Sequence, residues 1–399
     1  MKTILFVCYG SGHVRMVVPV AQALEAAGIA RPLVLALTTA APVARAAGLP
    51  VVQFKDFLRP GDEAALAHGQ RLMAGMTNVA DPAETAAYLG LSYAELETDV
   101  GAAQAGRRYA RDGRQAFLPR RVLQRILAEV APDVVVATNS PRAERAAIEA
   151  ARALGLPSIC LVDLFCMDEI KWIGAPDYAD RVCVLNASVK AFLLASGRSA
   201  GQVSVTGNPA FDAVFEPAAV EAGRQLRRER QWAGHRVLLW PTQVEPAFHP
   251  FNGEPGDTTL PGRALAALVA WVLDRKDCVL CVRPRAGEVA PVLPDHPRIL
   301  VTGQETSLPA LLHAVDVVVT LSSTVGLEGH LAGKRLVQVL GSVFDSAMPL
   351  AQYGIADEAV PLSDLGPALS RQVEMPRKAA AAGQGAATRR VVDVIREFL

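Results

Sequence analysis

A group of residues in the C-terminal half of the chain has the types and spacing that anion binding requires. Val315 to Leu321 is a β-branched run, typical of a parallel strand buried on both faces. It ends at Ser322, Ser323 and Thr324, residue types that cap helices, and a short helix is predicted over residues 325–332. Such a turn aims backbone N–H groups and the positive end of the helix dipole at one point, which suits a phosphate or diphosphate.

Glu328 lies one turn into this predicted helix, where its carboxylate could accept hydrogen bonds from a ribose diol. An anion site with an acidic residue one turn behind it is what a nucleotide diphosphate needs. The alternative is an ordinary capped helix with Glu328 in solvent. These residues alone favour neither interpretation.

A second candidate site lies at the start of the chain, where a strand over residues 3–8 breaks into a glycine-containing turn before a helix over 14–27. Because glycine lets a ligand approach the backbone closely, we expect Gly10, Ser11 and Gly12 to contact substrate. The turn has no third glycine at the dinucleotide spacing, and no acidic residue ends the second predicted strand, so NAD is not expected.

His13 closes this turn at the predicted helix start. An imidazole at a helix N-terminus tends to stay neutral, so His13 could act as a general base or donate a hydrogen bond to an anion. The alternative is a histidine that only caps the turn.

Further polar residues follow other predicted strands. Asp163 comes at the end of the strand over 157–162, the carboxyl end at which ligands of open α/β sheets bind. The strand over 236–240 ends in Pro241, and we expect the following residues to contact substrate; they are Thr242 and Gln243. The strand over 278–282 exits through Arg283 and Arg285, and arginine pairs bidentately with phosphate.

The alternation of predicted strands and helices indicates an α/β fold with two doubly wound domains. A strand stops at Gly207-Asn208-Pro209 and a charged helix follows, so we place the domain boundary there. The expected domains cover residues 1–208 and 209–385, followed by a terminal helix over 386–399. Residues 55–80 show no clear period and are expected to form a loop-rich excursion over the mouth of the first domain.

Composition limits the function classes. The 40 Lys and Arg residues balance 40 Asp and Glu residues, which gives no general attraction to nucleic acid. No run approaches 18 apolar residues, and no signal peptide is apparent, so we expect a cytoplasmic protein. Seven arginines lie between Arg107 and Arg125 against one acidic residue. A solvated face explains such a run; the alternative is a site for an anionic acceptor, or peripheral contact with the inner face of an anionic membrane.

The chain resembles the GT-B fold of nucleotide-sugar-dependent glycosyltransferases and the related UDP-N-acetylglucosamine 2-epimerases. Residues 10–13 are similar to the glycine-rich acceptor loop of the N-acetylglucosaminyltransferase of peptidoglycan synthesis. Residues 205–212 resemble the interdomain segment of the epimerases and lipid-A-type transferases, and residues 316–334 resemble the donor-binding segment of both groups. The resemblance implies two Rossmann-like domains facing a cleft, in which a nucleotide sugar, UDP-linked, is bound.

By this resemblance, the diphosphate would bind the backbone of Ser322, Ser323 and Thr324, Glu328 would bind the ribose, and the loop over 303–307 would lie along the base. Arg283 or Arg285 would neutralise the leaving diphosphate, since no metal site and no cofactor besides the donor are evident. His13 would remove the proton of the acceptor hydroxyl. The terminal helix would cross back to the first domain.

Departures from the epimerase pattern favour sugar transfer. The epimerases have a histidine-containing stretch after the second strand, where this chain has Thr38-Thr39, and a His-Pro pair where this chain has Arg283-Pro284. We therefore expect transfer of a sugar to a hydroxyl acceptor in cell-envelope, polysaccharide or glycoconjugate synthesis. The alternatives are epimerisation or hydrolysis of a nucleotide sugar and, from another class, a nucleotide-sugar-binding protein without activity.

Overall fold

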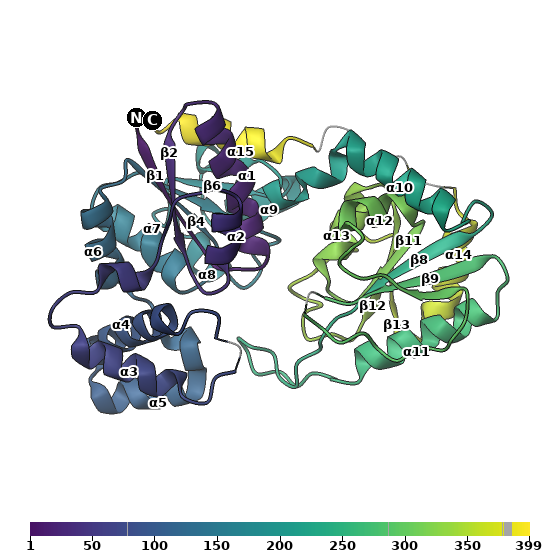
Figure 1. Ribbon diagram of the computed structural model, residues 1–399, viewed down its shortest axis with the longest axis horizontal. Helices are drawn as coiled ribbons and strands as arrows, with labels where there is room; N and C mark the ends of the chain where they lie inside the picture. The colour runs from purple at the N-terminus through teal and green to yellow at the C-terminus, as the bar shows by residue number, and fades with distance from the viewer. Residues whose placement is uncertain (78, 286, 377, 379–384) are drawn as a thin grey trace. The chain divides into compact units, whose positions relative to one another are not determined.

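The computed structural model describes every residue except 78, 286, 377 and 379–384. The chain divides into two compact units, which Figure 1 shows by residue number. Unit 1 comprises Met1–Ala210 together with Ala386–Leu399, and unit 2 comprises Phe211–Gly385. We expected the domain boundary after residue 208, and the division between the two units falls after Ala210.

Unit 1 contains a parallel sheet, which has seven strands in the described residues, in the order β3-β2-β1-β4-β5-β6-β7. Its central strands are wholly buried and mostly apolar, as a sheet covered on both faces requires, whereas the strands at the two edges are partly exposed. The strands are β1 (Thr3–Cys8), β2 (Arg31–Ala36), β3 (Val51–Val52), β4 (Val134–Thr138), β5 (Ser158–Leu161), β6 (Arg181–Val184) and β7 (Val203–Val205). Because β1 pairs with both β2 and β4, chain order reverses between β1 and β4, the point at which such sheets bind ligands.

Most unit 1 helices connect consecutive strands, and α15 returns from the end of the chain. Val391 and Ile395 of α15 share the unit 1 core with Val14 and Val17 of α1, so the apolar stripe of the terminal helix is buried there. The helices are α1 (Gly12–Ala26), α2 (Ala40–Ala46), η1 (Phe54–Phe57), α3 (Glu63–Met73), α4 (Pro82–Val100), α5 (Ala102–Asp112), η2 (Gly113–Ala116), α6 (Arg120–Val130), α7 (Ala143–Ala153), α8 (Ile170–Ile173), α9 (Ala187–Ala195), η3 (Ala200–Gln202) and α15 (Ala387–Arg396).

The segment expected as a loop-rich excursion is mostly helical, and that prediction was wrong. Within 55–80, η1 is followed by α3, which packs on α4 (Figure 1). A Cβ at Gly69 would lie 1.9 Å from the carbonyl oxygen of Ala86, and one at Gly90 would lie 2.1 Å from that of Ala65. The two helices therefore cross so closely that only glycine fits at these positions. Glycine usually weakens a helix, but here it allows the close contact between two helices.

Unit 2 repeats the arrangement. Its described strands form a parallel sheet in the order β10-β9-β8-β11-β12-β13, with the reversal between β8 and β11. The strands are β8 (Arg236–Pro241), β9 (Cys278–Arg283), β10 (Ile299–Val301), β11 (Val317–Thr320), β12 (Arg335–Leu340) and β13 (Glu358–Pro361). The helices are η4 (Pro209–Phe215), which spans the boundary, α10 (Pro217–Glu229), α11 (Leu260–Leu273), α12 (Leu308–Ala314), α13 (Thr324–Leu331), η5 (Leu362–Asp364) and α14 (Leu365–Glu374). The prediction of two Rossmann-like α/β domains is confirmed.

Candidate functional site

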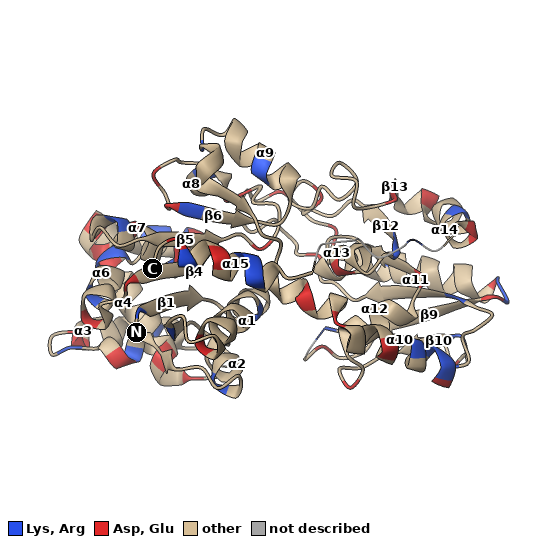
Figure 2. Cartoon of the chain, turned by 90° about the horizontal axis from the view of Figure 1, so that it is seen from above, with Lys and Arg blue, Asp and Glu red and all other residues tan. Residues whose placement is uncertain are grey.

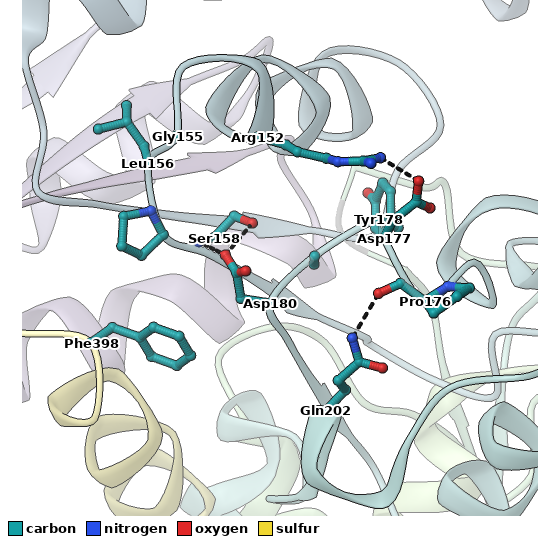
Figure 3. A pocket seen from close by; sticks show the side chains of 12 residues that line it. Arg152, Gly155, Leu156, Ser158, Pro176, Asp177, Tyr178, Asp180, Gln202 and Phe398 are labelled. Atoms are coloured by element: carbon teal, nitrogen blue, oxygen red, sulfur yellow. Dashed lines mark hydrogen bonds and ion pairs between the residues drawn. The ribbon is translucent and has the colours of Figure 1, made fainter.

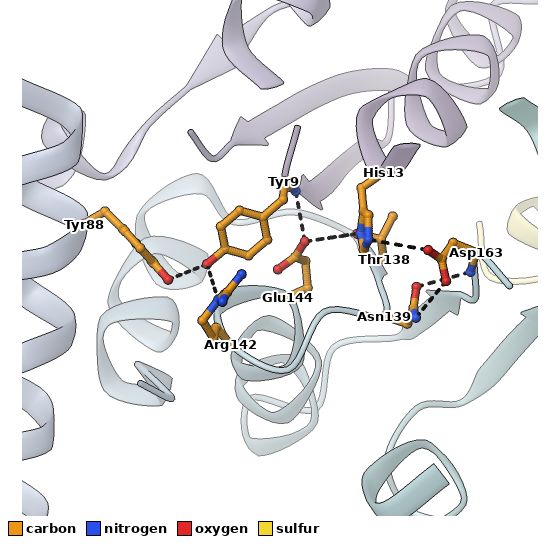
Figure 4. A network of polar contacts seen from close by, with 8 residues as sticks. All are labelled: Tyr9, His13, Tyr88, Thr138, Asn139, Arg142, Glu144 and Asp163. Atoms are coloured by element: carbon orange, nitrogen blue, oxygen red, sulfur yellow. Dashed lines mark hydrogen bonds and ion pairs between the residues drawn. The ribbon is translucent and has the colours of Figure 1, made fainter. Parts of the chain in front are cut away.

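The carboxyl edge of the unit 1 sheet gathers polar side chains beside the β1/β4 reversal (Figure 4). His13 is the second residue of α1, directly after the turn that follows β1. Thr138 ends β4, Glu144 lies in the first turn of α7, and Asp163 follows β5. The parallel sheet brings these residues together from distant parts of the sequence because the carboxyl ends of all its strands share one edge.

His13 lies between two carboxylates. Its Nδ1 is 2.7 Å from the Thr138 hydroxyl and 3.6 Å from Oε1 of Glu144, while its Nε2 is 3.7 Å from Oδ2 of Asp163. The Thr138 hydroxyl also lies 3.1 Å from Oε1 of Glu144, to which it can donate; in that arrangement its oxygen accepts from Nδ1 of the imidazole. Nδ1 then carries the ring proton, and Nε2 presents a lone pair. In that tautomer Nε2 could accept a proton, and the His13 side chain is 21% exposed; its role as a general base stays a prediction.

Glu144 is fully buried, and it contacts the imidazole of His13 through the Thr138 hydroxyl. Oε1 accepts the Tyr9 backbone N–H at 2.9 Å as well as the Thr138 hydroxyl. Burial raises the pKa of Glu144, against the opposing influence of His13. The Glu144 carboxyl therefore orients His13 through Thr138, and it lies too deep to meet a substrate.

Asp163 is fixed in place by neighbouring amides. Asn139 donates to Oδ1 of Asp163 at 3.0 Å, and Asn208 donates to its backbone carbonyl oxygen at 2.9 Å. Burial, together with the negative charge of Asp163, raises the pKa of nearby Glu169 to about 7. The edge thus combines an imidazole with a carboxyl group that can hold a proton near neutral pH.

Sequence reasoning missed Asn139, Glu144 and Glu169. Asn139 follows a predicted strand just as Asp163 does, so the rule that found Asp163 would also have found it. Glu144 looks like an exposed residue of a charged helix, because its burial depends on contacts with Tyr9 and His13 that no local pattern contains. Glu169 precedes α8, a short helix that we did not predict.

The turn before His13 is shaped by packing. A Cβ at Gly10 would lie 1.8 Å from Oγ1 of Thr39, so this glycine admits Thr39, whereas we expected it to admit substrate. A Cβ at Gly12 would meet nothing within 4 Å, which leaves space beside the start of α1. Ser11 has a φ of 59° and does not cap α1 with its side chain. The expected substrate contacts of these three residues stay predictions.

The side chain of Tyr9 extends from this turn into a buried aromatic contact (Figure 4). The hydroxyls of Tyr9 and Tyr88 share a hydrogen bond, and Nε of Arg142 donates to the Tyr9 hydroxyl at 3.1 Å. The Arg142 guanidinium also lies 4.6 Å from the centre of the Tyr9 ring. Helix α4, which carries Tyr88, is thereby joined to the turn before His13.

In unit 2, the side chain of Gln243 fills the turn between β11 and α13. Its Oε1 accepts from the Thr320 hydroxyl at 3.2 Å, from Leu321 N at 3.2 Å and from Ser322 N at 2.7 Å. Ser323 N donates to the Thr320 hydroxyl at 2.9 Å. Two of the backbone N–H groups that we expected to be free, those of Ser322 and Ser323, are therefore already bonded, which corrects that prediction.

The Ser323 hydroxyl accepts from Val325 N at 3.3 Å, so it caps α13. Thr324 is exposed at the helix start, and Glu328 is partly exposed on α13. Thr324 and Glu328 therefore stay accessible, although the Gln243 oxygen already bonds the backbone of the turn.

The two arginines after β9 have different environments. Arg283 is 8% exposed, and its guanidinium donates to the carbonyl oxygens of Gly303 and Thr306 at 3.0 and 2.8 Å. It thus braces the 303–306 loop, which differs from the expected phosphate contact. Arg285 is exposed, with Nε 3.4 Å from Oε2 of Glu288, and Glu288 also accepts from the Thr242 hydroxyl. Arg285 is the arginine that a phosphate could reach.

The arginine-rich segment is spread over α5, η2 and α6, and its charge is largely balanced. Four of its seven arginines form ion pairs, namely Arg111–Asp112, Arg120–Glu149, Arg121–Asp99 and Arg125–Asp62. Figure 2 shows acidic and basic residues interspersed along α6 and α7. This arrangement favours a solvated face. Within the described residues, no helix is both long and apolar enough to cross a bilayer, and no group of three or more His, Cys, Asp or Glu residues is placed to hold a metal ion.

A pocket of about 360 Å³ lies at the opposite edge of the unit 1 sheet (Figure 3). Its lining includes Ser158 and Asp180, at the amino ends of β5 and β6, and Phe398 after α15. The Asp180 carboxylate accepts from Ser158 N at 2.8 Å and so serves to join the strand starts. A smaller pocket, of about 140 Å³, lies at the carboxyl edge and includes Thr39 and Tyr88. Of these two pockets, the smaller shares Tyr88 with the network around His13 and Tyr9.

No protein-family model and no curated protein matches this sequence. Solved structures do match over the whole chain. MnaA of S. aureus, in a structure with UDP, has a TM-score of 0.62 at 14% identity, over 100% of this chain and 97% of that chain. The UDP-GlcNAc 2-epimerase of Neisseria meningitidis bound to UDP-GlcNAc has a TM-score of 0.59 at 12% identity, over 99% and 100%.

The glycosyltransferase SnogD of Streptomyces nogalater has a TM-score of 0.54 at 19% identity, over 100% of this chain and 96% of that chain. At these identities the likeness shows the fold. The expected resemblance to the GT-B glycosyltransferases and the UDP-GlcNAc 2-epimerases is thus confirmed for the architecture of the chain.

Proposed function

We propose that this protein acts on a UDP-linked sugar and transfers the sugar to a hydroxyl group of an acceptor. The observation that carries the proposal is the geometry of His13, whose Nδ1 lies 2.7 Å from the Thr138 hydroxyl while Nε2 lies 3.7 Å from Asp163. Structures with this fold hold UDP or UDP-GlcNAc, and one of them is a glycosyltransferase, which supports the choice of donor and reaction.

On unit 1, the acceptor hydroxyl would lie at Nε2 of His13 and give up its proton as its oxygen attacks the sugar. Asp163 would then stabilise the imidazolium across 3.7 Å, and Glu144 would keep the ring in place through Thr138. General-base catalysis of this kind contributes about 10²–10⁴-fold in rate.

On unit 2, the Gln243 oxygen marks a position at which one oxygen accepts three hydrogen bonds, from Thr320, Leu321 and Ser322. We place an oxygen of the donor diphosphate there after Gln243 moves aside, because backbone N–H groups beside a helix start suit phosphate. Glu328 would accept hydrogen bonds from the ribose, and Arg285 would neutralise the leaving diphosphate. We propose no cofactor besides the donor itself.

Epimerisation or hydrolysis of the nucleotide sugar is the second candidate. It is favoured by the gathering of His13, Asp163 and Glu169 at one edge, since epimerisation requires several acid–base groups around the sugar ring. UDP-GlcNAc 2-epimerases among the similar structures also support it.

The test is consumption of UDP-GlcNAc and other UDP-sugars by the full-length protein, with and without a panel of hydroxyl-bearing acceptors, followed by NMR. Transfer predicts release of UDP and a new glycoside only when an acceptor is present. Formation of an isomeric UDP-sugar without acceptor would show epimerisation, and release of free sugar without acceptor would show hydrolysis. Binding of UDP without turnover of any pair would support the non-catalytic alternative.

A further inference from the structure

The turn between β4 and α7 carries two polar side chains that the proposed function does not use. It covers residues 139–142 and lies at the carboxyl edge of the unit 1 sheet, next to the β1/β4 reversal. Asn139, at its start, is bonded to Asp163 in both directions. The other two polar side chains of the turn are those of Ser140 and Arg142.

Tyr9 holds the Arg142 side chain in one position (Figure 4). Nε of Arg142 donates to the Tyr9 hydroxyl at 3.1 Å, and the guanidinium carbon lies 4.6 Å from the centre of the Tyr9 ring. The ring is itself fixed, because it is buried and its hydroxyl shares a hydrogen bond with Tyr88. The guanidinium is therefore positioned before any ligand arrives, which lowers the entropic cost of binding one.

The terminal nitrogens of Arg142 are open to a ligand. Within the described residues these nitrogens have no hydrogen-bond partner, and Arg142 forms no ion pair. The residue is partly exposed, and its terminal nitrogens do not belong to the buried atoms that lack a partner, so solvent reaches them. An arginine in this state can bind an oxyanion through two parallel hydrogen bonds.

Ser140 adds a hydroxyl to the same turn. The residue is 7% exposed, and its hydroxyl has no partner in the part of the chain that the structure describes, although solvent reaches it. Helix α7 begins directly after the turn, so the positive end of its dipole faces these two side chains. A hydroxyl, a guanidinium and a helix start together suit the oxygens of a phosphate group.

The carboxyl group of Glu144 leaves the positive charge of Arg142 available. Glu144 acts electrostatically on Arg142, but its Oε1 accepts from the Tyr9 backbone N–H and lies beside Thr138 and His13. Burial raises the pKa of Glu144, which favours its neutral form. The turn therefore keeps a net attraction for an anion.

We propose that Ser140 and Arg142 bind a phosphate group of the acceptor. Its oxygens accept hydrogen bonds from the terminal N–H groups of Arg142 and from the Ser140 hydroxyl. Tyr9 and Glu144 lie between Arg142 and His13, so this phosphate belongs to a part of the acceptor away from the hydroxyl that attacks the sugar (Figure 4). The term acceptor rests on the proposed function, whereas the binding of phosphate does not.

Saturation-transfer NMR on the full-length protein tests the proposal, at low ionic strength and without nucleotide, with methyl phosphate and acetate as probes. Arg142→Gln should weaken methyl phosphate about tenfold or more, because it removes the charged donors. Ser140→Ala should weaken it about threefold to fivefold. Methyl phosphate bound at unit 2 would not respond to either change. Acetate, with one charge and two oxygens, should bind wild type about fivefold more weakly than methyl phosphate does.

Arg152→Gln is the matched control. It removes the same charge from the last turn of the same helix, where Arg152 pairs with Asp177. Because exposed charges far from a site are screened, methyl phosphate should bind this variant within about twofold of wild type.

No binding of methyl phosphate, equal affinities of Arg142→Gln and wild type, or an equal loss in Arg152→Gln would overturn the proposal. Ser140→Ala leaves the contact of Arg142 with Tyr9 intact, so it tests the site even if Arg142→Gln does not fold, and an unchanged affinity there would also overturn it. Acetate binding as tight as that of methyl phosphate would contradict the assignment to phosphate.

Consumption of UDP-sugars is measured separately, so failure of this site and failure of the proposed function are distinguishable. Binding of methyl phosphate that depends on Arg142, in a protein that turns over no UDP-sugar, would support this site and contradict only the proposed function.

Discussion

The carboxyl edges of the two sheets have the same strand and helix arrangement, but their polar groups differ in whether other residues already bond to them. In unit 1, the His13 side chain is 21% exposed, with Nδ1 beside Thr138 and the buried Glu144 and Nε2 beside Asp163. In unit 2, the backbone N–H groups of Leu321 and Ser322 are already bonded to Gln243. A strand followed by a helix start thus determines where ligand-binding groups lie. Whether they are free depends on a partner far away in the sequence.

Removal of His13 is the change with the largest expected effect, and it tests the unit 1 side of this comparison. His13→Ala should lower turnover by about 10²–10⁴-fold, because the general base is lost, while the Kd for UDP stays the same. Steady-state kinetics and calorimetry measure the two quantities. Thr138→Val, which leaves the ring but removes its anchor, should cost about tenfold. Turnover of His13→Ala within tenfold of wild type would mean that another group is the base.

The two arginines after β9 sharpen the comparison within unit 2. Arg283→Ala should lower the free energy of unfolding by about 2–4 kcal/mol, since it leaves the carbonyl oxygens of Gly303 and Thr306 without their charged donor. Arg285→Ala should change it by less than about 0.5 kcal/mol but lower turnover. Urea denaturation and kinetics on both variants measure this. A stability loss of equal size in the two would contradict the separate assignments.

Glu84 predicts a pH dependence of the stability of unit 1. Its pKa is raised from 4.5 to about 7, so the folded chain holds a proton that the unfolded chain has lost in this window. The stability contributed by protonated Glu84 is therefore fully present below about pH 4.5 and is lost as the pH rises through about 7.

Glu84→Gln stays neutral, so its stability relative to wild type should rise by about 1–3 kcal/mol between about pH 5 and about pH 8. Urea denaturation at both pH values measures the difference. A constant difference between the two proteins would show that burial does not hold a proton on Glu84.

Gln243→Ala has the smallest expected effect and tests whether the unit 2 site is blocked. If the diphosphate displaces the Gln243 oxygen, the variant should bind UDP about twofold to fivefold more tightly, because no hydrogen bonds to Gln243 need to be broken first. Uridine, which lacks phosphate, should bind both proteins equally. Loss of UDP binding in the variant would instead make Gln243 a contact of the nucleotide.

Sequence patterns were sufficient for the architecture and for part of the site. The β-branched run and the helix caps around Ser323 predicted β11 and α13, because local composition determines buried parallel strands and helix starts. The position of His13 after the first strand followed in the same way. By contrast, the bonding of Ser322 to Gln243 and the burial of Glu144 against Tyr9 join residues 79 and 135 positions apart. No window of local pattern contains such contacts.

The central claim is that unit 2 binds a nucleotide diphosphate while unit 1 supplies the base. Thermal unfolding with UDP, GDP, CDP, CMP and TDP, on wild type, Glu328→Ala and His13→Ala, tests it most directly, because a ligand that binds only the folded state stabilises it by mass action. We expect a nucleoside diphosphate, UDP above all, to raise Tm in wild type and His13→Ala, and much less in Glu328→Ala. No shift with any of these nucleotides, or the same loss in both variants, would contradict the account.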